Sequence, residues 1–141
     1  MAAAALTPRV RIMTICDGVR ESKTEAGVFH LKGVRQGIVA EAFPFKPSGL
    51  WLFLMLSSPQ AGEFPGHVRV VNDQTDKTVF FGHLNPNPRF DHAHEMVSGF
   101  IRLNCAFPLE GRYTVQIWFF REQEPDVLKG ELPFFVESMG V

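Results

Sequence analysis

The stretch that decides the fold is Leu109–Phe120, LEGRYTVQIWFF. A Gly turn precedes Tyr113, and apolar residues then recur at every second position, which is the period of a β-strand. Immunoglobulin-like sandwiches place a Tyr at the entry to a late strand, where its hydroxyl bonds to an upstream backbone group. Tyr113 is the only Tyr in the chain, and its position favours a structural role over a catalytic one. Three apolar residues share its face and are expected in the core: Val115, Ile117 and Phe119.

Other short apolar runs, separated by Gly and Pro, indicate further strands, whereas helical periodicity is absent from the longer stretches. The link at Lys32–Gly33 is either a turn or a bulge. We therefore predict an all-β fold, an antiparallel two-sheet sandwich of the immunoglobulin-like kind with about seven to nine strands. The expected strands are Arg9–Cys16, Val28–Leu31, Gly33–Ala40, Leu50–Ser57, His67–Asn72, Thr78–Leu84, Met96–Cys105, Gly111–Arg121 and Val127–Glu137.

The length of 141 residues fits one domain that can build a core without metals or disulfides. We expect a flexible tail over residues 1–8 and a single sandwich domain over residues 9–141. The 14 basic and 15 acidic residues give a net charge of −1. This balance provides no long-range field for binding nucleic acid or an anionic membrane, so neither is an expected partner.

The chain shows no export signal, and its longest apolar run, Leu50–Leu56, is far shorter than the roughly 20 residues of a membrane helix. A cytoplasmic location is therefore expected, with Cys16 and Cys105 as reduced thiols. No sequence neighbour supplies a base for Cys16, so a buried position is favoured over a nucleophile. Nucleophile elbows, phosphate-binding loops and zinc-protease motifs are also absent, so we predict no enzyme, no catalytic residues and no cofactor.

The densest cluster of ionisable residues lies between His83 and Glu95. His92 and His94 would point the same way on a strand, and Asp91 or His83 would then be a third metal ligand. The alternative is a solvated polar loop before a strand. Two nearby His residues without a complete ligand set favour that loop, so we predict no bound metal.

Two of the expected strands are apolar on both faces. In Leu50–Ser57 the Leu residues alternate with large apolar side chains, and Leu109–Phe120 ends in the same way. A sandwich strand normally has one wet face, so something must cover the second one. A loop of the chain (Phe90–Met96 or the N-terminal tail), another subunit, or a ligand stacked on the Trp rings would do so. The predicted interface residues are Trp51, Phe53, Met55, Trp118 and Phe120.

The order and spacing of several short segments add a family resemblance that covers about Arg9–Val136. The segments are Ile15-Cys16-Asp17, VFHLKGV at 28–34, Phe43-Pro44, the strand from Leu50, GHVRV at 66–70, GRYTV at 111–115 and LPFFV at 132–136. In these, the chain resembles an uncharacterised bacterial single-domain family, a domain of unknown function with a β-sandwich fold. The resemblance implies that fold and a bacterial cytoplasmic setting, and it implies no activity and no functional residues.

Two functions from different classes follow from the covered second face. The first is a non-catalytic interaction module that self-associates or is a subunit of a bacterial assembly, with another copy or a second protein as partner. The alternative is a ligand-binding module, in which Trp51 and Trp118 form a stacking platform for a sugar-like small molecule.

Overall fold

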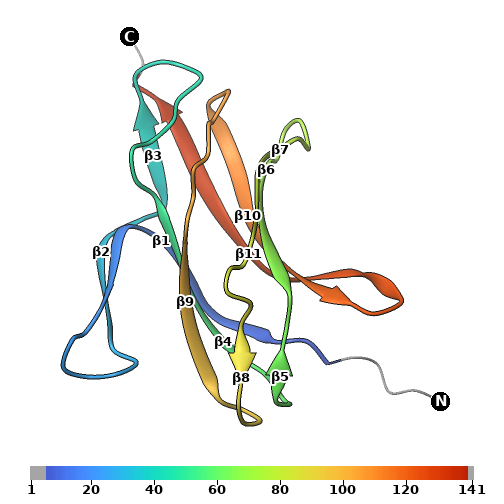
Figure 1. Cartoon of the computed structure of the whole chain (residues 1–141). Helices are drawn as coiled ribbons and strands as arrows, with labels where there is room; N and C mark the ends of the chain where they lie inside the picture. Colours follow the sequence, from blue (N-terminus) through green and yellow to red (C-terminus); the bar gives the residue numbers. More distant parts are fainter. Residues whose placement is uncertain (1–5, 140–141) are drawn as a thin grey trace.

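The computed structural model describes residues 6–139, which form an all-β protein without a helix (Figure 1). Eleven strands are present in this range, more than expected, because β5 and β8 contain two residues each and gave no sequence signal. The strands are β1 (Arg9–Glu21), β2 (Phe29–Arg35), β3 (Gly37–Ala40), β4 (Trp51–Ser57), β5 (Gly62–Glu63), β6 (Gly66–Asn72), β7 (Thr78–His83), β8 (Arg89–Phe90), β9 (Met96–Arg102), β10 (Gly111–Arg121) and β11 (Glu124–Ser138).

The strands form two main sheets and one short pair. Sheet A is antiparallel in the order β2-β1-β4-β9, sheet B has the order β3-β11-β10-β6-β7, and β5 pairs with β8. The strands are mainly antiparallel, as predicted, with an exception in sheet B, where β3 runs parallel to β11 with Ile38 opposite Val136. Alternation of apolar residues specifies which side chains share a face, and it does not specify the direction of a neighbouring strand.

The core lies between the inner faces of sheets A and B. The Leu residues of β4 alternate inward, and Val115, Ile117 and Phe119 of β10 are at most 1% exposed. Both sets belong to one buried cluster, as the period of two predicted. The part of the predicted N-terminal tail formed by residues 1–5 lies outside the described residues, and β1 begins at Arg9 as expected.

Tyr113 is completely buried at the start of β10. Its hydroxyl donates a hydrogen bond to the carbonyl oxygen of Leu109 at 2.7 Å, and the Leu109 N–H donates to the hydroxyl at 3.4 Å. The ring packs edge-on against Phe107, with centroids 4.9 Å apart. The predicted structural role of Tyr113 is confirmed, because both polar contacts tie the strand to the turn that precedes it.

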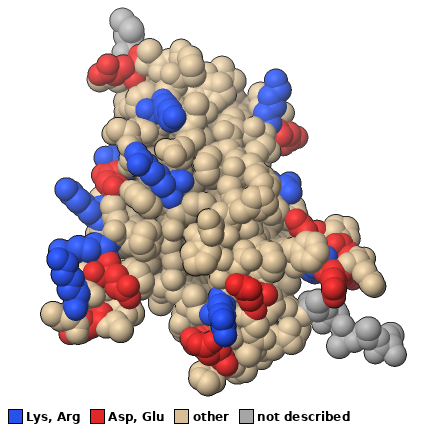
Figure 2. All heavy atoms as spheres, in the orientation of Figure 1, with Lys and Arg blue, Asp and Glu red and all other residues tan. Residues whose placement is uncertain are grey.

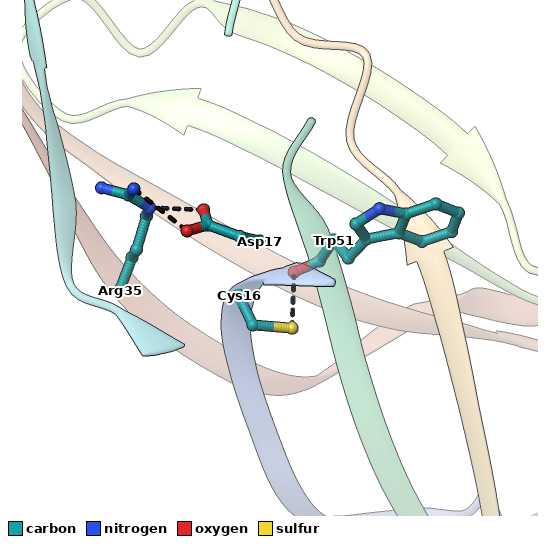
Figure 3. A network of polar contacts seen from close by, with 4 residues as sticks. All are labelled: Cys16, Asp17, Arg35 and Trp51. Carbon is teal, nitrogen blue, oxygen red and sulfur yellow. Dashed lines mark hydrogen bonds and ion pairs between the residues drawn. The ribbon is translucent and has the colours of Figure 1, made fainter. Parts of the chain in front are cut away.

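The β1–β2 hairpin extends further than predicted and projects from one side of the molecule (Figure 1). No strand break occurs at Lys32–Gly33; Gly33 lies inside β2 with a φ of 64°, and β3 begins two residues after Arg35. The Arg35 guanidinium binds both carboxylate oxygens of Asp17 from the paired strand (Figure 3). This contact is the main reason that the pKa of Asp17 is lowered.

Candidate functional site

The predicted metal candidates do not meet at one place. Asp91, His92 and His94 follow β8 in a turn rather than on a strand, so the geometry assumed for His92 and His94 is absent. The Glu95 carboxylate accepts hydrogen bonds from the N–H groups of Asp91 and His92, at 2.9 and 3.0 Å. His83 instead belongs to β7. Among residues 6–139, no three His, Cys, Asp or Glu side chains are grouped so that they could hold a metal ion.

The five predicted interface residues lie on two different sheets. Trp51, Phe53 and Met55 belong to β4 of sheet A, and Trp118 and Phe120 belong to β10 of sheet B. In both strands these residues alternate with core residues, so each set faces outward from its own sheet. The single continuous patch is therefore not formed, and the two indoles do not make one stacking platform.

The outer face of sheet A is partly covered by its own chain. Phe53 is only 5% exposed, because the ring of Phe29 from β2 lies 5.3 Å from its ring. Phe100 of β9 completes the cluster, 6.5 Å from Phe29 and 5.7 Å from Trp51. At Phe53 the cover thus comes from β2, which was not among the covers predicted from the sequence, the Phe90–Met96 loop and the N-terminal tail. Residues 1–5 of that tail lie outside the described residues.

The outer face of sheet B carries a group of rings that we call the ring cluster: His67, Phe81, His83 and Trp118, with the guanidinium of Arg69. His67 is its centre and is 6% exposed. Its ring stacks on Phe81 at 4.7 Å and lies parallel to Trp118 at 6.2 Å. Phe81, by contrast, is half exposed. The cluster joins strands β6, β7 and β10 on the side away from the core.

Arg69 is held within the ring cluster by three contacts. Its guanidinium carbon lies 4.6 Å from the Trp118 ring centroid and 5.9 Å from that of Phe81. Its Nε donates a hydrogen bond to Nε2 of His67 at 2.9 Å. Nε2 is therefore an acceptor, which is consistent with the lowered pKa of His67; burial is the main cause, followed by the charge of Arg69. A cation held between two rings is ordered before any partner arrives.

His67, Arg69 and Phe81 were not predicted as site residues from the sequence. The sequence predicts which residues of β6 and β7 share a face. It does not predict that β6 lies between β7 and β10. Arg69 lies opposite Phe81 on one side and opposite Gln116 on the other. Only this register brings the rings together, and a period of two carries no information about it.

A second candidate site is an apolar groove of about 690 Å³ between the edge strands of the two sheets. β9 forms one wall and the segment after β7 forms the other. Its apolar lining includes Leu54, Leu56, Leu84, Val97 and Ile101. Figure 2 shows the face that carries β9: its middle is largely free of Lys, Arg, Asp and Glu, which gather around the periphery.

The thiols offer little for catalysis. Cys16 and Cys105 are both free and buried, so the predicted buried position of Cys16 is confirmed. The Sγ atom of Cys16 lies 3.8 Å from the carbonyl oxygen of Trp51 (Figure 3). Burial raises the pKa of Cys16, and it raises that of Cys105 to about 12. Both thiols are therefore protonated at neutral pH and poor nucleophiles.

The comparisons assign no family to this fold and these sites. No protein-family model matches the chain, and no curated protein matches it. Residues 6–139 contain no helix with the length and hydropathy of a membrane-spanning segment.

Proposed function

We propose that the protein is a non-catalytic interaction module that self-associates through the outer face of sheet B. The observation that carries this proposal is the ring cluster, in which Trp118, Phe81 and Arg69 lie together on the side of the sheet away from the core. Interface centres are enriched in aromatic residues and Arg, and truncation of Trp and Arg commonly has the largest effect on binding.

The location of the cluster supports this choice over sheet A. On sheet A the outward ring of Phe53 already packs against Phe29 of the same chain. On sheet B, Phe81 is 50% and Phe120 is 54% exposed. Exposed apolar groups that gather on one face commonly mark binding sites, and a two-fold dimer is the commonest way to cover them.

The fold proposal is an immunoglobulin-like sandwich, supported by the buried hydroxyl contact between Tyr113 and Leu109 and by two sheets of mainly antiparallel strands. In this arrangement sheet B is a continuous surface that β10 crosses at its centre. The resemblance to a bacterial, cytoplasmic β-sandwich family remains part of the proposal.

Trp118→Glu should weaken self-association by at least about tenfold, because it places a charge among rings that the interface must keep dry. Sedimentation velocity from about 1 to 100 µM measures the monomer–dimer equilibrium. Phe100→Glu is the matched control: it adds the same charge in place of an outward aromatic ring on sheet A. Circular dichroism checks that both variants are folded. A wild-type monomer over the whole range, or dissociation by Phe100→Glu alone, contradicts the proposal.

A second candidate function is binding of a small apolar ligand in the groove beside β9. The volume of about 690 Å³ lies within the range of ligand sites, roughly 300 to 1,000 Å³. This site replaces the platform of two Trp rings, which belong to different sheets.

Gly99→Val tests the groove, because Gly99 lines it and a Cβ added there meets no atom within 4 Å. Two methyl groups would fill ligand space without disturbing the strand. We expect at least about tenfold weaker binding of the dye 1-anilinonaphthalene-8-sulfonate, measured by fluorescence titration. Gly49→Val is the control, since Gly49 also faces open space and lies outside the groove. Equal dye binding by both variants and the wild type argues against a ligand site here.

A further inference from the structure

The strand register of sheet B arranges the outer face in rows around β10. Gln116 of β10 lies opposite Arg69 of β6 on one side and opposite Glu131 of β11 on the other. Its own face is the outer one, because its amide oxygen accepts a hydrogen bond from Nε1 of Trp118 at 3.0 Å. A positive and a negative side chain therefore flank β10 at the same height, about 10 Å apart across two strand spacings.

Among residues 6–139, neither charge has a partner of opposite sign. The polar contact of Arg69 is the one from Nε to His67, which leaves the two terminal nitrogens without an acceptor among residues 6–139. Within the same range, the carboxylate of the exposed Glu131 accepts no hydrogen bond and forms no ion pair. The fork of the Arg69 guanidinium suits a carboxylate, but the Glu131 of the same chain lies beyond Gln116.

We propose that the partner of this face is a second copy of the chain, related by a two-fold axis that runs along β10 in the plane of the interface. The inference rests on the proposed function. Such a rotation exchanges the two sides of β10 and keeps the height along it. Arg69 of each copy then faces Glu131 of the other, so one geometric operation satisfies all four charges.

The neighbouring rows are compatible with the same axis. Trp118 lies on β10 between His67 and Leu128, so the rotation places Trp118 near its own copy and His67 near Leu128. In the row on the other side of Gln116, the rotation brings Val71 of one copy against Pro133 of the other. Rings and aliphatic groups thus surround the two ion pairs and keep water away from them.

The charge pattern also argues against a face-to-face arrangement whose axis is perpendicular to β10 and passes through the row of Gln116. Such an axis would keep each side of β10 and reverse the height along it. Arg69 would then face Arg69, and Glu131 would face Glu131. Like charges in contact across an interface cost several kcal/mol, so the charges select the axis along β10.

Charge reversal at the two positions tests this arrangement. Arg69→Glu and Glu131→Arg should each weaken the homodimer by at least about tenfold, because each creates two repulsive pairs. An equimolar mixture of the two variants should form a heterodimer. In it, the introduced carboxylate of one chain faces the introduced guanidinium of the other, and the unchanged Glu131 of the first chain faces the unchanged Arg69 of the second. Sedimentation velocity at matched total concentration measures recovery, expected within about threefold of the wild-type affinity.

Lys23→Glu and Glu25→Arg are the control pair, because both residues are exposed in the turn between β1 and β2, which belong to sheet A and not to sheet B. Neither should change dimerisation. Circular dichroism and a thermal melt show whether Arg69→Glu disturbs the ring cluster. If it does, a mixture of Arg69→Gln with Glu131→Gln should dimerise better than either variant alone, because the heterodimer keeps one Arg69–Glu131 pair that neither homodimer has, while single Glu131→Arg still dissociates. Arg69→Glu and Glu131→Arg chains that are folded and remain monomeric when mixed overturn the two-fold arrangement. In that case dissociation by Trp118→Glu alone still supports the face, whereas a monomeric wild type overturns both proposals.

Discussion

Phe119→Ala should lower the free energy of unfolding by about 3–5 kcal/mol, whereas Phe120→Ala should lower it by less than about 1 kcal/mol. The two residues are neighbours on β10 with identical side chains. Phe119 is 0% exposed and belongs to the core cluster, and Phe120 is 54% exposed on the outer face. Truncation of Phe119 removes buried apolar surface and leaves a cavity that the packed sheets fill only in part.

Urea unfolding followed by circular dichroism measures both changes. The slope of the unfolding free energy against urea concentration must be the same for the wild type and both variants. Only then does a difference in the unfolding midpoint report a difference in stability. Measurements belong at concentrations where the wild type is monomeric, because loss of a dimer would add to the effect of Phe120→Ala. Equal losses for both variants would show that β10 does not present alternate residues to the core.

The sequence predicts well what depends on local alternation. The faces of β10, the inward Leu residues of β4 and the role of Tyr113 follow from period two and one turn. Each is a property of a single strand and the residues next to it. For that reason these predictions needed no knowledge of which strands are neighbours.

The sequence does not predict what depends on pairing between distant segments. The parallel β3–β11 pair and the separation of Trp51 from Trp118 both follow from strand order. The cover of Phe53 by Phe29 has the same origin, since β2 is distant from β4 in the chain. The strand register is also not predicted, and only this register places Arg69 between Phe81 and Gln116. These contacts are selected by packing of the whole sandwich.

The polar turn after β8 shows a different limit. His92 and His94 alternate with Ala93 as they would on a strand, but the Glu95 side chain bonds the N–H groups of Asp91 and His92. Side-chain bonds of this kind stabilise turns and compete with regular strand pairing. A carboxylate near the end of such a run is therefore evidence against reading it as a strand.

Gly33→Ala should destabilise the protein by about 2–3 kcal/mol, through backbone strain and a local clash. Gly33 has a φ of 64°, a left-handed conformation that costs a residue with a Cβ about 1–2 kcal/mol. A Cβ at this position would also collide with the carboxylate of Asp17, which lies across the hairpin and binds Arg35. The methyl group therefore strains β2 and displaces one partner of the ion pair.

Gly18→Ala is the matched control in the same hairpin, because the nearest atom to its added Cβ is Lys32 Cβ at 3.9 Å. Its φ lies outside the left-handed region, so we expect a change within about 0.5 kcal/mol in urea unfolding.

The double variant Asp17→Ala/Gly33→Ala separates the two causes. Asp17→Ala alone should have a small effect, since the ion pair is exposed to solvent. In the Asp17→Ala background, Gly33→Ala should cause backbone strain but no clash, and so should lower the free energy of unfolding by about 1–2 kcal/mol. If Gly33→Ala lowers the free energy of unfolding as much in the Asp17→Ala background as in the wild type, the added methyl group does not clash with the Asp17 carboxylate. If Gly33→Ala has no effect in either background, the backbone at Gly33 is not left-handed.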